Sequence, residues 1–297
     1  MHRVLVLGKT GMLGSMVFRV LSSHKTLHVE GTHRLDSSDP LFFDVEDGIQ
    51  PLRTLARRGN GYHYVINCIG VTPREINERD SKSIRSAIRI NALFPQELGV
   101  FSEEMSARII HISTDAVFSG RQGPYLEDSP HDCVDVYGKT KSLGEAVRDR
   151  FLNVRCSIIG TDPIEKKGLL EWFLAQSNPV IQGYIDFEWN GVTTLQFAQL
   201  CAKIILEDRF DDLRKESHVY HFCPNNPVSK YELLKIFQRV FLKETEIVRA
   251  RLGLTSLCRV LLSKYNAFDL LFGQGLAMED AVRQLSHAPL SKSSAPS

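Results

Sequence analysis

The sequence of 297 residues lacks any apolar run of about 18 residues, the minimum for a membrane-spanning helix. It also lacks a charge imbalance: its formal net charge is +1, which argues against a general binder of nucleic-acid polymers. Its first residues run directly into an apolar stretch, without the basic leader and cleavage site of a signal peptide. We therefore expect a cytoplasmic protein with neither a membrane nor a nucleic-acid polymer as partner.

The sequence has no C-x-x-C pair and no internal repeat. Its six cysteines are scattered, and several of them sit within apolar runs. This pattern predicts buried thiols in a reducing compartment, with neither a disulfide framework nor a metal site. The cysteines are Cys68, Cys133, Cys156, Cys201, Cys223 and Cys258.

Three glycines follow the first apolar stretch, residues 3–7, which is typical of a buried parallel strand. Gly8, Gly11 and Gly14 precede a helical pattern. A strand followed by a G-x-x-G-x-x-G loop and then a helix is typical of a dinucleotide-binding site. The pyrophosphate then lies at the helix N-terminus. The alternative is a glycine-rich turn without a ligand, and a Walker A loop is excluded because Arg3 stands where that motif needs glycine. The expected cofactor contacts are Gly8, Thr10, Gly11, Met12, Leu13 and Gly14.

A second strand is expected over residues 27–32, and His33 and Arg34 follow it. An acidic residue near this position binds the ribose hydroxyls of NAD, whereas a basic residue suits the 2′-phosphate of NADP. The pair therefore favours NADPH, with NADH as the alternative cofactor and a solvated loop arginine as the alternative interpretation. Asp44 either accepts from the adenine amino group or caps the next helix.

Two further strands, residues 64–68 and 108–112, end in polar side chains. Parallel strands place such ends at the carboxyl edge of the sheet, where ligands lie. A hydroxyl in Ser113-Thr114-Asp115 can hydrogen-bond a substrate carbonyl there. Asn91 lies in a helical region between these strands, either as a bridge near the site or as an ordinary helix asparagine. The expected cofactor contacts of this region are Asn67, Cys68, Ile69, Gly70 and Asn91.

A fifth strand over residues 152–156 completes a β-α-β-α-β-α-β-α-β order, which predicts an α/β fold with a doubly wound parallel sheet. The second half is less regular, and its apolar stretch 249–272 is not assigned. We expect helices over residues 169–174, 194–207 and 229–242, a strand over 219–222, an aromatic loop over 182–190 and a disordered tail over 291–297.

Tyr137 and Lys141 lie four residues apart. In a helix these two side chains share one face. A phenol ordinarily loses its proton near pH ~10, and a neighbouring ammonium favours the phenolate, so we expect a lowered pKa for Tyr137. Such a tyrosine is the acid that ketone reduction needs. The spacing alone also fits an exposed helix face without chemistry.

Together the motifs resemble the extended short-chain dehydrogenase/reductase family, and most closely its dTDP-4-dehydrorhamnose reductase branch of NDP-sugar 4-ketoreductases. STDAVFSG at residues 113–120 and YGKTKSLGE at residues 137–145 are the most specific segments. The resemblance covers nearly the whole chain. The other matching segments are GKTGMLG at 8–14, INALFP at 90–95, PYLED at 124–128, WNGVTT at 189–194 and MEDAVRQL at 278–285.

The resemblance implies that Tyr137 is the general acid, that Lys141 lowers its pKa and holds the nicotinamide ribose, and that Thr114 polarises the ketone. NADPH would deliver hydride to C4 of a 4-keto-6-deoxy sugar nucleotide, a precursor of cell-surface polysaccharide. No metal is implied, and a homodimer is the assembly that we consider. The other implied substrate contacts are Asp115, Ala116 and Trp189.

The resemblance further implies a Rossmann-type NADP-binding domain over residues 1–160, joined later by about 190–222, and a smaller sugar-nucleotide lobe mainly over 161–290. Two residues depart from the branch. Ala116 stands where an aromatic residue is usual, so we expect a larger sugar site that admits a substituent such as an N-acetyl group at C2. Leu7 replaces the usual threonine before the first glycine, which removes one hydrogen bond of the loop.

Two other functions stay open. Relatives of this branch serve as non-catalytic, NADP-binding regulatory subunits of other enzymes with the Y-x-x-x-K pattern intact. An NDP-sugar epimerase or dehydratase is the other alternative. An NAD-dependent epimerase would be expected to carry an acidic residue at position 34, where this chain has Arg34. A dehydratase would be expected to carry a glutamate at position 116, where this chain has Ala116.

Overall fold

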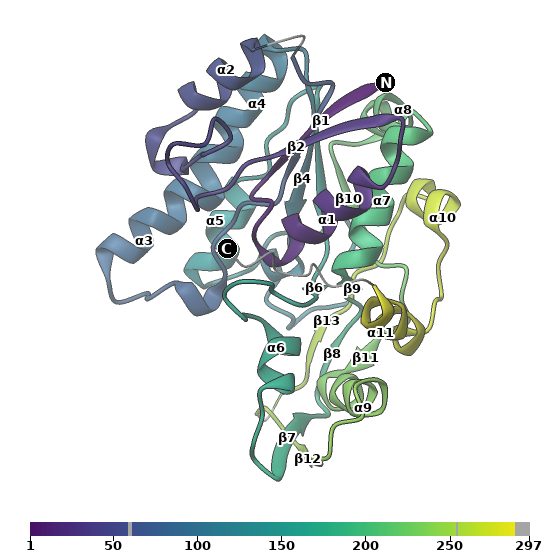
Figure 1. Ribbon diagram of the computed structural model, residues 1–297. Coiled ribbons are helices and arrows are strands. Elements are labelled where there is room, and N and C mark those ends of the chain that lie inside the picture. Colours follow the sequence, from purple (N-terminus) through teal and green to yellow (C-terminus); the bar gives the residue numbers. More distant parts are fainter. Residues whose placement is uncertain (59–60, 254, 289–297) are drawn as a thin grey trace.

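The computed structural model describes residues 1–58, 61–253 and 255–288. Figure 1 shows a sheet with helices on both faces, above a smaller lobe. The predicted α/β fold with a doubly wound parallel sheet is confirmed. The tail expected over 291–297 lies outside the described residues. Among the described residues, no helix combines the length and the apolar character that crossing a bilayer demands.

The central sheet is parallel throughout, with the strand order β2-β1-β3-β4-β5-β10. Because β1 lies between β2 and β3, the connections on its two sides cross opposite faces, and the carboxyl end of β1 is the switch point where ligands bind. The sixth strand comes from the second half of the chain. The strands are β1 (His2–Leu7), β2 (Leu27–Gly31), β3 (Tyr64–Asn67), β4 (Arg108–Ser113), β5 (Phe151–Arg155) and β10 (Val219–His221).

Local capping explains where two important helices begin. The Asp135 side chain accepts from the Gly138 N–H at 2.7 Å and begins α5, and Thr193 with Gln196 forms a reciprocal capping box that begins α7. A π-helical turn at Ile88–Leu93 joins α3 to α4. The helices are α1 (Met12–Ser22), α2 (Gln50–Arg57), α3 (Ser81–Ala87), α4 (Phe94–Glu104), α5 (Val136–Leu143), α6 (Leu169–Leu174), α7 (Thr194–Leu206), α8 (Phe210–Glu216), α9 (Lys230–Val240), α10 (Ala267–Phe272) and α11 (Met278–His287).

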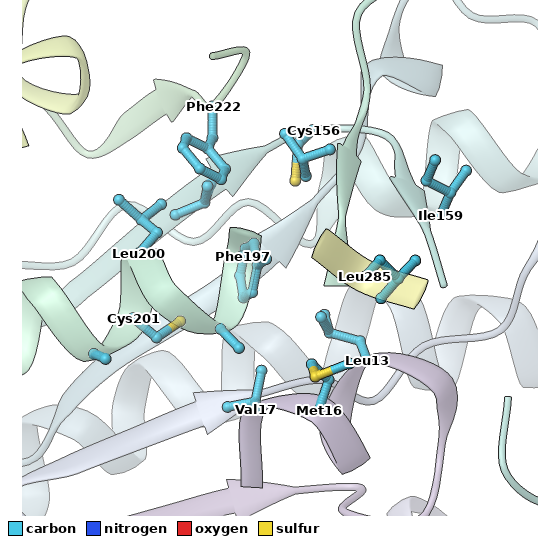
Figure 2. Close-up of a cluster of buried hydrophobic side chains, with 14 of the residues drawn as sticks. Leu13, Met16, Val17, Cys156, Ile159, Phe197, Leu200, Cys201, Phe222 and Leu285 are labelled. Carbon is cyan, nitrogen blue, oxygen red and sulfur yellow. The ribbon is translucent and has the colours of Figure 1, made fainter. Parts of the chain in front are cut away.

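Helices bury both faces of the sheet, which is why its strands are apolar on both sides. Val6 of β1 points into a cluster with α1 and α7, whereas Leu7 points into the opposite cluster with α2 and α4. In Figure 2, Val17 of α1 and Phe197 of α7 lie within one group of buried side chains. This group holds the helix that follows the glycine loop against the second half of the chain.

The smaller lobe is built from strands whose partners lie far downstream. The prediction of a loop over residues 182–190 is wrong, because most of these residues belong to strands β7 and β8. Their partners lie about 40 to 70 residues downstream, two of them in or beside the stretch 249–272, so no local pattern reveals the pairing. The pairs are β7 (Val180–Tyr184) with β12 (Glu246–Ala250), β8 (Phe187–Trp189) with both β11 (Val228–Ser229) and β13 (Leu257–Arg259), and β6 (Ile158–Ile159) with β9 (Val192–Thr193).

One segment, residues 258–262, joins the lobe to the sheet half, and we call it the clasp segment. On the sheet side, the Leu262 N–H donates to the Tyr125 carbonyl at 2.8 Å. On the lobe side, the Asn190 amide donates to the Leu261 carbonyl at 2.7 Å and accepts from the Leu261 N–H at 2.8 Å. Both halves of the molecule therefore fix the same stretch of backbone.

The six cysteines are all free thiols. Cys156 and Cys201 are buried, as expected, whereas the other four are partly exposed. The prediction of buried thiols is therefore right for two positions, and the other four side chains keep part of their surface exposed.

The core cluster of Figure 2 predicts a large stability effect at Phe197. Its ring is fully buried, so Phe197→Ala should lower the free energy of unfolding by roughly 3–5 kcal/mol, measured by urea denaturation. Leu206→Ala, at a position on the same helix that is 41% exposed, is the matched control and should change stability by less than about 1 kcal/mol. Equal losses for the two variants would contradict the packing described.

Candidate active site

A cavity of about 670 Å³ lies between the carboxyl ends of the strands and the smaller lobe. The loops after β1, β3 and β4 line one side of it, α5 contributes two side chains, and the lobe closes the other side. Expected site residues at its wall are Met12, Leu13, Cys68, Ile69, Gly70, Thr114, Asp115, Ala116, Tyr137 and Lys141.

The glycine loop after β1 has the geometry for a pyrophosphate. Gly8 has a φ of +76°, and a Cβ on Gly14 would lie 2.1 Å from the Gly8 carbonyl oxygen, so both positions need glycine. Gly11 starts α1 without a side-chain cap, which leaves the first-turn N–H groups for an anion. The residues present therefore fit the phosphates of a dinucleotide. Thr10 lies in the turn, away from the cavity wall.

A threonine outside the glycine loop hydrogen-bonds this loop, whereas the Leu7 side chain has no group that could do so. The Thr32 hydroxyl, just after β2, accepts from the Gly8 N–H at 3.0 Å. This side chain is fully buried, so the bond is shielded from water. The glycine loop is therefore held by the neighbouring strand rather than by the residue before it.

The residues expected at the adenosine end lie outside the cavity. His33 is buried and its Nε2 lies 2.9 Å from an Asp39 carboxylate oxygen, so its ring is occupied within its own loop. The Arg34 guanidinium is exposed and lies 3.7 Å from Asp44. Asp44 also accepts from the Glu46 N–H at 3.0 Å, so of the two alternatives for this carboxylate the cap is the one observed.

Two asparagines order the loop that follows β3. The Asn67 side chain accepts from the Ile69 N–H at 3.1 Å and lies 3.0 Å from His111 Nδ1. Asn91, on the π-helical turn, accepts from the Val71 N–H and donates to its carbonyl, both at 3.0 Å. Asn91 is therefore a backbone bridge near the site, as π-helical turns often provide at functional positions.

Thr114, Tyr137 and Lys141 meet at the cavity wall. Burial raises the pKa of Tyr137 to about 12, while hydrogen bonding to the Thr114 hydroxyl acts against this rise. Burial lowers the pKa of Lys141 to about 8, and Glu145 partly opposes that shift. The lowered phenol pKa expected from the spacing is therefore wrong for this structure, because burial disfavours the charged phenolate.

The geometry explains why the lysine has so little influence on the phenol. The Lys141 ammonium donates to the Ile112 carbonyl at 2.7 Å, at the end of β4. Thr114 accepts from the Ala116 N–H at 3.1 Å and begins a short 3₁₀ turn. The result is a protonated phenol at neutral pH beside a hydroxyl, which is the arrangement for giving a proton to a carbonyl oxygen.

A buried ion pair fixes the end of β4 relative to α5. Arg155 donates from Nε and Nη2 to the Glu145 carboxylate, both at 2.7 Å, and the Ser113 hydroxyl donates to the same carboxylate at 2.6 Å. Burial raises the pKa of Glu145, but Arg155 outweighs this and the net pKa is lowered. The Glu145 carboxylate therefore links the strand end before Thr114 to the segment that follows the helix of Tyr137.

The comparisons with known proteins agree with this architecture. The model of one protein family, described as "RmlD substrate binding domain", matches residues 1–252. The chain belongs to this family. A dTDP-4-dehydrorhamnose reductase of Mycolicibacterium smegmatis is 33% identical over 146 residues, which are 48% of this chain and 40% of that protein. The chain thus spans less than half the length of this curated relative.

The chain is also similar to a subunit of another enzyme and to a solved structure that contains NADP. The methionine adenosyltransferase 2 subunit beta of Xenopus tropicalis is 29% identical over 146 residues, covering 48% of this chain and 42% of that protein. Among solved structures, a dTDP-4-dehydrorhamnose reductase from Bacillus anthracis in complex with NADP has a TM-score of 0.76 at 18% identity, covering 96% of this chain and 99% of that one. At this identity the structural similarity shows the fold alone.

In this member of the family, Lys230 and Arg259, which were not among the expected site residues, reach the cavity from the lobe. The pairing of β8 with β11 and β13 brings them together: Lys230 Nζ lies 3.9 Å from the Trp189 ring centroid, and Arg259 Cζ lies 5.8 Å from that of Phe187. Burial lowers the pKa of Lys230 to about 8, and Asp115 opposes this shift. None of the ion pairs within the described part of the chain includes either cation.

Two sequence signals could have revealed these cations. Lys230 is the first residue of α9, where the helix dipole disfavours a positive charge, and Arg259 interrupts an apolar run. Trp189, expected at the sugar, is instead 1% exposed, does not line the cavity, and packs beneath Lys230. Its ring is large enough to fill the lobe interior beside Gly191, which explains its burial.

The two buried lysines should titrate far below ordinary lysines. The side-chain amines of Lys141 and Lys230 should lose their proton as pH rises through about 8, because burial disfavours the ammonium. The chemical shifts of the isotope-labelled lysine side chains report this change. The variants Lys141→Met and Lys230→Met assign the two signals by NMR. Exposed Lys25 serves as the control. If all three titrate together, the burial described for the two cavity lysines is wrong.

Proposed function

We propose that the protein catalyses the NADPH-dependent reduction of the C4 ketone of an NDP-4-keto-6-deoxy sugar. The product would serve as a precursor of cell-surface polysaccharide, made in the cytoplasm. The observation that carries the proposal is the meeting of Thr114, Tyr137 and Lys141 at one cavity wall that also receives the start of α1. The similarity to dTDP-4-dehydrorhamnose reductases supports the same reaction class.

NADPH, when bound, supplies the hydride. The side chains of this chain then have separate tasks. Thr114 hydrogen-bonds the ketone oxygen, and Tyr137 gives that oxygen a proton as negative charge develops on it. Lys141 would hold the nicotinamide ribose, and its charge would stabilise the phenolate that remains.

The charge of the cavity wall suits two phosphorylated ligands. The residues that line it include one carboxylate, that of Asp115, and four cationic side chains. Asp115 is itself held in a buried position that raises its pKa, although Arg259 and Lys230 oppose the rise. An excess of positive charge in a partly desolvated cleft attracts anions such as nucleotide diphosphates. The four cationic residues are Arg74, Lys141, Lys230 and Arg259.

The division of labour between the two parts of the chain is also part of the proposal. Residues 1–160, with β10 and α7 from the region 190–222, would hold the dinucleotide. Residues 161–290 would mainly hold the sugar nucleotide, because their aromatic and cationic side chains face the cavity opposite Tyr137. This division follows from which loops reach the carboxyl edge of the sheet.

A second candidate function is a non-catalytic, NADP-binding subunit of another enzyme. The observation in its favour is the Lys141 ammonium, which is engaged with the Ile112 carbonyl instead of Tyr137. The similarity to the beta subunit of methionine adenosyltransferase 2 favours it as well. The two candidates differ in whether NADPH is consumed, so turnover decides between them.

The central prediction concerns the proton donor. Tyr137→Phe removes only the hydroxyl, so it should lower kcat by at least ~10²-fold while NADPH affinity stays within about 2-fold of wild type. The assay follows NADPH absorbance with a panel of dTDP- and UDP-linked 4-keto-6-deoxy sugars. Tyr184→Phe, which changes another tyrosine of the same cavity, is the matched control and should leave kcat nearly unchanged.

The outcomes separate the candidates. A Tyr137→Phe variant that reduces the sugar at the wild-type rate would falsify the assigned acid. A wild-type protein that binds NADPH, consumes none with any sugar of the panel, and co-purifies with a second enzyme would establish the binding-subunit function instead.

The small side chain at Ala116 predicts the preferred substrate. Ala116 is buried at the cavity wall beside Thr114, so Ala116→Tyr should lower kcat/KM for a 2-acetamido substrate by ~10-fold or more, and affect a 2-hydroxy substrate less. NADPH affinity, measured by calorimetry, should not change. Ala116→Gly keeps the space and serves as the control. Equal effects on the two sugars would show that position 116 does not face C2.

A further inference from the structure

Glu145 is a buried carboxylate to which the proposed mechanism gives no task. It lies just beyond the end of α5, four residues after Lys141. The Glu145 carboxylate accepts from the Ser113 hydroxyl at 2.6 Å, and the Lys141 ammonium donates to the Ile112 carbonyl at 2.7 Å. Contacts with consecutive residues of β4 therefore hold a carboxylate and an ammonium near each other, and both side chains are withdrawn from water.

The other titratable side chains packed around Lys141 in the described part of the chain carry no charge at neutral pH. Burial raises the pKa of the Cys156 thiol, which follows β5, and lowers that of the His111 imidazole on β4. Burial also raises the pKa of Tyr137, on the same helix, to about 12. Glu145 is thus the charged neighbour that favours the ammonium.

Arg155, the last residue of β5, keeps the Glu145 carboxylate ionised. Burial alone would raise the pKa of Glu145, but the Arg155 Nε and Nη2, each 2.7 Å from a carboxylate oxygen, lower it. Asp115, the acid at the cavity wall, interacts with the two lobe cations instead. Burial lowers the pKa of Lys141 to about 8, and the charge of Glu145 keeps it from falling further.

We propose that Glu145 is a positioning residue that acts through Lys141, because its charge holds the lysine as an ammonium at neutral pH. The inference rests on the proposed function, in which the Lys141 charge stabilises the Tyr137 phenolate. Burial makes that phenolate unfavourable, so proton donation by Tyr137 depends on the ammonium beside it. Neither Glu145 nor Arg155 lines the cavity, so this pair serves the chemistry without touching the substrate.

Titration of the isotope-labelled Lys141 side chain by NMR tests the proposal without turnover, in the full-length protein. Glu145→Gln removes the charge at nearly constant size, so the midpoint should fall from about 8 by roughly one pH unit or more. Ser113→Ala is the matched control, because it breaks the same hydrogen bond and keeps the charge, and it should leave the midpoint unchanged. Glu171→Gln, at a buried glutamate on α6, should leave it unchanged too.

A second variant addresses the buried arginine that Glu145→Gln leaves without a partner, which can destabilise the fold. Glu145→Gln combined with Arg155→Gln removes both charges of the pair. This double variant should retain most of the fall in the Lys141 midpoint, because Glu145 is the member of the pair that acts on the lysine.

The pH profile of turnover carries the same signature. The ammonium is lost as pH rises through the pKa of Lys141, so kcat should decline on the alkaline side. In Glu145→Gln this decline should move to lower pH by the shift seen in the NMR midpoint. At pH ~6, where Lys141 is still protonated, kcat should stay within about 3-fold of wild type.

Two results would overturn the inference alone: an unchanged Lys141 midpoint in Glu145→Gln and in the double variant, or a fall of equal size in Ser113→Ala. The second result would mean that the midpoint responds to loosening of the strand end rather than to charge. If the midpoint falls as expected but the wild-type protein consumes no NADPH with any sugar of the panel, the proposed function fails while the control of the Lys141 charge by Glu145 is supported.

Discussion

Parallel pairing of β1 with strands on both sides is the constraint on which the rest of the structure depends. Parallel strands end at the same edge, so the loops after β1, β3 and β4 are brought together although they are far apart in the chain. Burial of the sheet on both faces then leaves this edge as the place where polar side chains collect. The glycine loop, Thr114 and the asparagines that order the loops all follow from that geometry.

Burial is also what sets the chemistry of the site. A tyrosine four residues before a lysine suggests a lowered phenol pKa, but withdrawal of both groups from water raises the pKa of Tyr137 and lowers that of Lys141. The ammonium finds its partner in the Ile112 carbonyl, which is a backbone group that no sequence pattern names. At neutral pH the site therefore holds a protonated phenol, and its lysine is bonded to the backbone at the end of β4.

The sequence predicted the sheet half well and the lobe poorly, for physical reasons. The strand and helix patterns of the first half are local, and Gly14 and Thr114 occupy positions whose neighbours along the chain reveal their role. The strands β7 and β8 pair with segments far downstream, so the aromatic stretch looked like a loop. Lys230 and Arg259 were missed because only that pairing brings them together, and Trp189 was misplaced because its burial depends on the same sheet.

The clasp segment has a consequence for the order in which the molecule is assembled. Tyr125 and Leu262 are bonded across more than a hundred residues of chain, and Asn190 holds the neighbouring residue from the other side. Closing so long a loop costs conformational entropy before any contact compensates for it. During synthesis, the glycine loop and Tyr137 therefore emerge before the segment that forms part of the far wall of the cavity. Only after the ribosome has released the clasp segment can Arg259 reach the cavity, so in the incomplete chain the cavity is open on the side of the lobe.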